Sequence, residues 1–121
     1  MNINCISLEK KRSKRYNFKK LLQSKDSLIW KNCSDLEIII NSKINKLILI
    51  NCKSIKIIIG NTISGIDLEN CENVKIYLIK NKNFGFLSCF KSKLFLFLHK
   101  NTSLKNIMIN SENSKIYYKY I

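Results

Sequence analysis

The amino-acid sequence predicts an all-β fold, a single-stranded right-handed parallel β-helix of about five to six coils. Three features of the 121-residue chain indicate this fold: apolar residues alternate with polar ones, a polar pair repeats at nearly constant spacing, and hairpin signals are missing. The chain has no proline and no Asn-Gly or Asp-Gly dipeptide. An antiparallel sandwich would need such turns every ~10 residues, so it is disfavoured.

The repeat is marked by a short pair of residues, most often Asn-Cys. The steps between the second residues of successive pairs are 19, 19, 18 and 22 residues. Such regularity predicts stacked structural units rather than a chance bias in composition. The pairs are Asn32-Cys33, Asn51-Cys52, Asn70-Cys71, Ser88-Cys89 and, more loosely, Asn110-Ser111.

Apolar residues at every second position lie on both sides of each pair, which predicts two short strands in each unit. Two short strands cannot bury their apolar face alone, so the units are expected to stack as coils ~4.8 Å apart. Equivalent residues then form ladders along the axis. In chain order, the expected inward residues are Leu28 and Trp30, Ile38 and Ile40, Leu47 and Leu49, Ile57 and Ile59, Ile66 and Leu68, Ile76 and Leu78, Phe84 and Phe86, Leu94 and Leu96.

The N-terminal stretch differs in composition and is treated as a separate segment. Residues 1–25 are expected to be a basic arm or an irregular first coil, and residues 26–121 the β-helix domain. From Ser7 to Ser24 an amphipathic basic helix is the other open interpretation. The run KKRSKRYNFKK, Lys10 to Lys20, is the densest charge of the chain. It is either a solvated tail or an arm for acidic protein, nucleic acid or anionic lipid.

The charge balance favours acidic partners, because 22 Lys and Arg face only 8 Asp and Glu, for a formal net charge of +14. No glycine-rich phosphate loop and no zinc-finger spacing occurs, so no specific nucleic-acid binding is expected. No secretory signal is recognisable at the start, and no apolar run approaches the ~20 residues that cross a bilayer. The expectation is a cytoplasmic protein with reduced thiols.

The repeated cysteines and asparagines invite a chemical explanation, which the ladder argues against. Zinc needs about four ligands around one point, whereas stacked corners spread their thiols over several coils. A structural corner ladder is therefore expected, with no metal and no cofactor, in which asparagines hydrogen-bond from coil to coil. One histidine and few carboxylates give no catalytic constellation, so the protein is expected not to be an enzyme. The ladder residues are Asn32, Cys33, Asn51, Cys52, Asn70, Cys71 and Cys89.

Outward lysines are the better candidates for a binding role. They fall at polar positions of the coils, and stacking would gather several of them on one face, where they would attract an acidic protein. A solvated face in a lysine-rich chain is the competing explanation. The candidates are Lys46, Lys53, Lys56, Lys75, Lys91 and Lys93.

The coil phrases DSLIWKNCSDLEIIINSKINKLILINCKSIKIIIGNTISGIDLENCENVKIYL resemble the C-terminal β-helix domain of the adenylyl cyclase-associated proteins. The likeness includes the segment Lys43 to Leu47 and the corner Ile50 to Lys53, and it extends from about Asp26 to Tyr118. The resemblance implies a C-CAP/cofactor C-like domain over residues 26–121 that is associated with the cytoskeleton. It also implies binding of ADP-bound actin monomers, through the candidate lysines, and promotion of their nucleotide exchange.

A related group with the same fold, similar to tubulin-binding cofactor C, supplies the alternative partners, tubulin or a small GTPase. That group uses an arginine four residues before a coil cysteine. Here Gly85 stands four residues before Cys89, and no arginine follows Arg15. The chain also ends in YYKYI, where cyclase-associated relatives continue into a segment that pairs across a dimer, so a monomer and a homodimer are both open.

Overall fold

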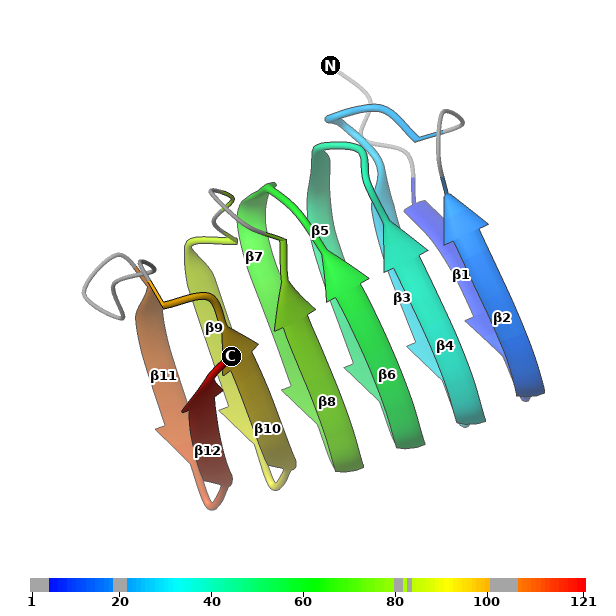
Figure 1. Cartoon of the computed structure of the whole chain (residues 1–121). Coiled ribbons are helices and arrows are strands. Elements are labelled where there is room, and N and C mark those ends of the chain that lie inside the picture. Colours follow the sequence, from blue (N-terminus) through cyan, green and yellow to red (C-terminus); the bar gives the residue numbers. More distant parts are fainter. Residues whose placement is uncertain (1–4, 19–21, 80–81, 83, 101–106) are drawn as a thin grey trace.

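The computed structural model describes residues 5–18, 22–79, 82, 84–100 and 107–121. These residues form two six-stranded parallel sheets that face each other, as Figure 1 shows. The odd sheet holds β1 (Cys5–Glu9), β3 (Ser27–Lys31), β5 (Ile44–Ile50), β7 (Thr62–Glu69), β9 (Phe86–Phe90) and β11 (Met108–Glu112). The even sheet holds β2 (Arg12–Phe18), β4 (Ser34–Ile40), β6 (Lys53–Ile59), β8 (Glu72–Leu78), β10 (Lys93–Leu98) and β12 (Lys115–Tyr120).

Each strand of one sheet is followed in sequence by a strand of the other, so two consecutive strands make one coil. Neighbours within a sheet are consecutive coils and pair in parallel. The predicted parallel β-helix is therefore confirmed. Hairpins are absent from the described pairings because the chain returns to each sheet only after crossing the other one.

The core lies between the sheets and consists of rows of aliphatic side chains. Leu28, Leu47 and Ile66 stand in register on the odd sheet and are fully buried. On the even sheet, Ile38 and Ile57 form a comparable row. β-Branched and leucine side chains suit such rows because they pack closely on a pleated surface.

The N-terminal stretch is part of the solenoid. Strands β1 and β2 pair with β3 and β4 and form the first coil, so the β-helix begins before residue 26. Within the described part of this stretch neither an arm nor a helix occurs. Tyr16 and Phe18 close this end of the core, and both rings meet Trp30 edge-on, with centroids 6.0 and 6.1 Å away.

The corner from the odd to the even sheet explains the Asn-Cys pair. Asn32, Asn51 and Asn70 have positive φ angles of 56°, 54° and 51°. Among residues other than glycine, asparagine tolerates this left-handed backbone best. The asparagine backbone nitrogens bond the next coil, as Asn51 N–H donates to the Glu69 carbonyl at 2.9 Å. The predicted coil-to-coil bonding between asparagine side chains is not found among the described corners.

The residue after each of these asparagines points inward, and its side chain hydrogen-bonds backbone groups near the corner that would otherwise lack a partner. Cys52 Sγ lies 3.4 Å from the carbonyl oxygens of Trp30 and Ile50 and donates to them. The Lys11 backbone N–H in turn donates to Cys33 Sγ at 3.4 Å. A buried backbone group left unpaired costs free energy, so the corner side chain must combine a donor with an acceptor.

Strand register corrects the alignment of the last two coils. Cys89 lies beside Leu68, and Ser111 lies beside Cys89, so neither is a corner residue. The corners are Lys91-Ser92 and Asn113-Ser114, where Lys91 and Asn113 have φ angles of 50°. We call Cys33, Cys52, Cys71, Ser92 and Ser114 the corner ladder.

The repeat was misaligned at Ser88-Cys89 because one connection between strands is longer than the others. The successive corners Cys71 and Ser92 are 21 residues apart rather than 19, because the connection before β9 is longer. The pair Ser88-Cys89 therefore resembles a corner but lies in a strand. Phe86, expected inside, consequently faces outward with 47% of its surface exposed, while Phe84 and Leu87 are buried.

Replacing Ser92 tests the corner bonding. The Cys71 backbone N–H donates to Ser92 Oγ at 3.0 Å, and that hydroxyl donates to the Phe90 carbonyl at 3.0 Å. Ser92→Ala should lower the free energy of unfolding by about 1–3 kcal/mol, because a buried N–H loses its acceptor. Ser92→Cys should cost much less, since cysteine fills the preceding corners. Urea unfolding measures both, and equal losses would contradict the corner role.

Candidate functional site

The outer face of the even sheet carries two rows of large side chains. Lys56, Lys75, Phe95 and Tyr117 stand in register on β6, β8, β10 and β12. The neighbouring row contains Ile58, Tyr77 and Phe97. Both rows point away from the core because they alternate with its buried residues. With Lys93, these residues form what we call the aromatic–lysine face: Lys56, Ile58, Lys75, Tyr77, Lys93, Phe95, Phe97 and Tyr117.

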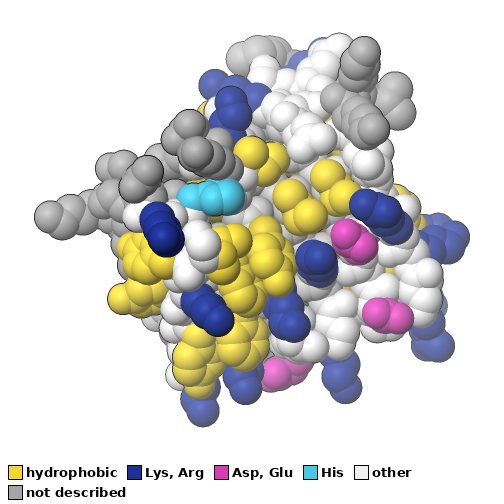
Figure 2. Space-filling model, in the orientation of Figure 1, with side chains coloured by type: hydrophobic (Ala, Val, Ile, Leu, Met, Phe, Trp, Pro, Cys, Tyr) yellow, Lys and Arg dark blue, Asp and Glu magenta, His cyan; other side chains and the backbone are white. Residues whose placement is uncertain are grey.

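The aromatic rings of this face are stacked between coils. Tyr77 and Phe97 have centroids 4.3 Å apart and planes 6° from parallel, and Phe95 and Tyr117 have centroids 5.2 Å apart. Parallel pairing places equivalent residues one strand spacing apart, which is close to the stacking distance of rings. Figure 2 shows hydrophobic side chains gathered on this face, with Lys and Arg around them.

Two lysine ammonium groups of this face lie against the rings. Lys56 Nζ is 5.3 Å from the Tyr77 centroid, and Lys93 Nζ is 5.8 and 5.9 Å from those of Phe95 and Tyr117. Cation–π attraction holds such ammonium groups in place without neutralising their charge. None of the face's three lysines, Lys56, Lys75 and Lys93, has a salt bridge to a described carboxylate. The face therefore offers fixed positive charge beside exposed apolar surface.

This combination suits recognition of an acidic protein surface. Aromatic side chains contribute large contact area with little loss of conformational entropy on binding, and unpaired lysines attract carboxylates and speed encounter. Rings that are already stacked are also pre-organised, which lowers the entropic cost of association.

The structure separates the predicted lysines into two groups. Lys56, Lys75 and Lys93 come together on the aromatic–lysine face, and Lys53 lies on the same sheet, in register with Glu72. Lys46 is on the odd sheet, where its Nζ is 2.8 Å from Asp67 Oδ2. Lys91 is at a corner, with its Nζ 5.1 Å from the Phe90 centroid on the odd side.

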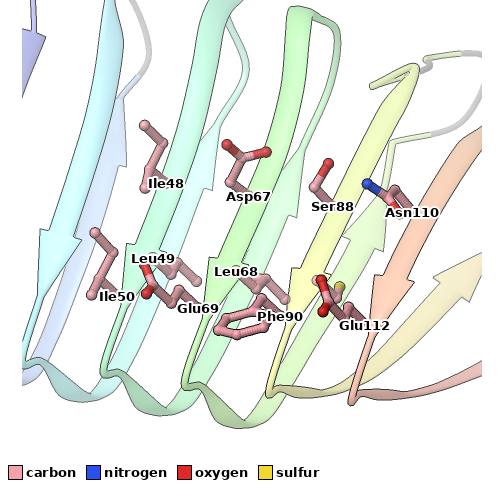
Figure 3. A pocket seen from close by; sticks show the side chains of 11 residues that line it. Ile48, Leu49, Ile50, Asp67, Leu68, Glu69, Ser88, Phe90, Asn110 and Glu112 are labelled. Carbon is pink, nitrogen blue, oxygen red and sulfur yellow. The ribbon is translucent and has the colours of Figure 1, made fainter.

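The outer face of the odd sheet has the opposite character. A shallow groove of about 310 Å³ crosses β5, β7, β9 and β11. Figure 3 shows carboxylates, polar groups and apolar side chains from neighbouring strands along it. Asp67, Glu69 and Glu112 line this groove, together with Ile48, Ile50 and Phe90. Its carboxylates would repel an acidic partner, so Lys46 and Lys91 do not belong to the candidate site.

Sequence reasoning missed the aromatic residues of the site. In KLFLFL, residues 93–98, apolar residues occupy both the inward and the outward positions. One of the two apolar sets had to face solvent. This pattern is the sequence signal for exposed apolar residues on this strand. The structure buries Leu94, Leu96 and Leu98, which leaves Phe95 and Phe97 outside.

The cysteines have the environment of structural thiols. Burial raises the pKa of Cys33, and it raises the pKa of Cys89 to about 11, with a smaller contribution from the nearby Asp67 carboxylate. The hydrogen bond to Cys71 is the largest cause of a raised pKa at Cys52. Among the described residues no cluster of His, Cys, Asp and Glu could hold a metal ion.

Gly85, the position relevant to the GTPase alternative, precedes β9. It has a φ of 73° and is partly buried, and a Cβ built there would have no heavy atom within 4 Å. Space for a side chain exists, but glycine supplies no cation for a phosphate.

Comparisons with known proteins found one matching family model and one similar fold. A family model described as adenylate cyclase associated (CAP) C terminal matches residues 12–117. The solved structures include a similar one, the cyclase-associated protein from Cryptosporidium parvum, with a TM-score of 0.81 and 18% identity; the match covers 98% of this chain and 75% of that chain. A search of curated proteins gave no match. Within the described ranges, no helix has the length and hydropathy needed to cross a membrane.

Thiol reactivity tests the structural role of the cysteines. In a Cys5→Ser variant, Cys33, Cys52, Cys71 and Cys89 remain, and all four are buried. At mildly alkaline pH the burial of all four, together with the raised pKa values of Cys33, Cys52 and Cys89, should keep an aromatic disulfide reagent from reacting until the protein unfolds. We expect no fast thiol in the native state and four in denaturant. A fast native reaction would indicate an accessible, functional cysteine.

Proposed function

Because the chain belongs to the family of adenylate cyclase associated (CAP) C-terminal domains, we propose that it is an actin-monomer-binding module that promotes nucleotide exchange on ADP-actin. It acts in the cytoplasm, beside the cytoskeleton whose monomers it recharges. The family model covers most of the chain, and it is not a cofactor C model, so tubulin and GTPases are not favoured.

The aromatic–lysine face is the observation that carries this proposal. Actin's surface is largely acidic, and this face combines unpaired lysines with stacked rings on a rigid sheet. The opposite face carries the carboxylates of the groove and would be repelled by the same partner. Charge therefore selects which side of the solenoid meets actin.

Exchange would follow from differential affinity rather than from chemistry on the nucleotide. A partner that binds better to monomers with an open nucleotide cleft shifts their population towards that state and speeds nucleotide loss. A rigid, pre-stacked surface serves this purpose because it does not adapt equally well to both states. No cofactor and no catalytic residue are needed for such an action.

The basic test is release of a fluorescent nucleotide from ADP-actin with and without this protein. We expect faster release and a stable complex in size-exclusion chromatography. If neither acceleration nor a complex is seen, the proposed function is wrong.

Charge reversal on the face should weaken the complex. Lys56 and Lys75 are exposed neighbours in register. Lys56→Glu with Lys75→Glu should lower affinity for ADP-actin at least ~10-fold at low salt, and less at high salt, because attraction becomes repulsion. The control is Lys25→Glu with Lys43→Glu, which changes net charge equally at exposed residues outside the strands. An equal loss of affinity in both variants would show that net charge, and not the position of these lysines on the face, causes the loss.

Removing a ring should weaken the complex by another route. Tyr117 and Phe86 are each 47% exposed, but Tyr117 belongs to the aromatic–lysine face and Phe86 to the odd sheet. Tyr117→Ala should reduce affinity roughly 10-fold, mainly through faster dissociation, as for interface aromatic residues generally. Phe86→Ala should leave the affinity nearly unchanged. Stopped-flow binding measures both; a larger effect at Phe86 would place the interface on the other sheet.

A further inference from the structure

Strand β2 leaves one of its edges open. It is the outermost strand of the even sheet and pairs only with β4 among the described strands, as Figure 1 shows. Backbone hydrogen bonds at this end point to the second coil; for example, Ser34 N–H donates to the Lys11 carbonyl at 3.0 Å. Among the described residues no strand pairs with the other edge of β2, so its backbone groups can pair with an added strand.

Positive charge is concentrated along this edge. Five cations stand within six consecutive residues, and all are at least partly exposed: Lys10, Lys11, Arg12, Lys14 and Arg15. The nearest described ion pair is weak, with Arg15 Nε 3.9 Å from Glu37 Oε1 and two thirds of the Arg15 side chain exposed. Asp35 is engaged by Ser13, whose hydroxyl donates to Oδ2 at 2.9 Å. The edge therefore keeps most of its charge.

The same strand carries two rings at its inward positions. Tyr16 and Phe18 stand in register with Ile38 and Ile40, and both are only partly buried. Lys14 occupies the inward position before them, in register with Leu36. A further coil would thus meet a cation first and then two rings at alternate positions.

Charge also decides what cannot add to this edge. The far edge of the same sheet is β12, which carries Lys115 and Lys119. Stacking the last coil of one copy on the first coil of another would bring like charges together, which is unfavourable. An acidic strand is attracted where a second copy of this chain is repelled.

We propose that the open edge of β2 binds an extended acidic segment of a partner protein as an added parallel strand. The partner carries carboxylates opposite Lys14 and Arg15 and apolar residues opposite Tyr16 and Phe18. Backbone hydrogen bonds provide affinity, and the alternating side chains provide register. This surface lies at the end of the solenoid and is separate from the aromatic–lysine face.

A peptide fits this edge better than a nucleic acid does. Open backbone N–H and C=O groups are matched by another extended backbone, which nucleic acids lack. Bases bind single-stranded readers by stacking on exposed aromatic faces. Tyr16 and Phe18 instead stand at core positions, with Trp30 edge-on against them.

The test uses the full chain and a fluorescent peptide containing Glu-Glu-Val-Ser-Val, with Val-Val-Glu-Ser-Glu as the shuffled control. Fluorescence anisotropy should show saturable binding of the first peptide, weakened by salt, and much weaker binding of the second. Hydrogen exchange should slow for backbone amides of Arg12–Phe18 when the first peptide binds. Equal binding of the two peptides, or no slowing in β2, would overturn the proposal.

Matched variants separate the two edges of the sheet. Lys14→Glu with Arg15→Glu should reduce peptide affinity roughly 10-fold or more. Lys115→Glu with Lys119→Glu changes net charge equally at the other edge and should reduce it less than ~2-fold. Circular dichroism checks that both remain folded. If the patterned peptide fails, and single-stranded DNA or phosphatidylserine vesicles bind through Lys14 and Arg15 instead, the proposal is wrong.

Discussion

The structure depends on one recurring interaction, the hydrogen bonding of the corner residue between the two sheets. At each turn the chain leaves one ladder of backbone bonds before it enters the next. A side chain with both a donor and an acceptor bridges that gap, as Cys52 does towards Trp30 and Ser92 does for Cys71. Cysteine and serine share this capacity, which explains why serine takes over in the last two coils. The residue before it must accept a left-handed backbone, and asparagine does so at four corners, Asn32, Asn51, Asn70 and Asn113.

Once the corners are stacked, every outward position is stacked as well. Residues with the same place in successive coils become neighbours ~4.8 Å apart, whatever their distance in sequence. This rule brings Lys56 beside Lys75 and Phe95 beside Tyr117. It also divides charge between the faces, with lysines and rings on the even sheet and a groove lined by Asp67, Glu69 and Glu112 on the odd sheet. Partner choice then becomes a property of one face rather than of the net charge of +14.

The fifth coil, formed by β9 and β10, shows where the sequence pattern fails to predict the corner. Ser88-Cys89 has the composition of a corner, but the register with Asp67 and Leu68 places it in a strand. Lys91 occupies the left-handed position with no asparagine to mark it. The type of residue pair predicted the corners correctly where successive corners are 19 residues apart. It failed where a longer connection changed that spacing. Burial decided the register, because Leu87, Cys89 and Leu94 had to meet the core.

The sequence by itself determined the parallel β-helix and the positions of the three Asn-Cys corners, since period-two alternation and a constant repeat are local properties of the chain. Only the tertiary structure decided that the basic N-terminal stretch is a coil, that Lys46 pairs with Asp67 on the opposite face, and that stacked rings support Lys56 and Lys93. These features depend on register between coils and on which of two apolar sets turns inward. Both are determined by packing between residues far apart in the sequence, and the length of the repeat does not specify that packing.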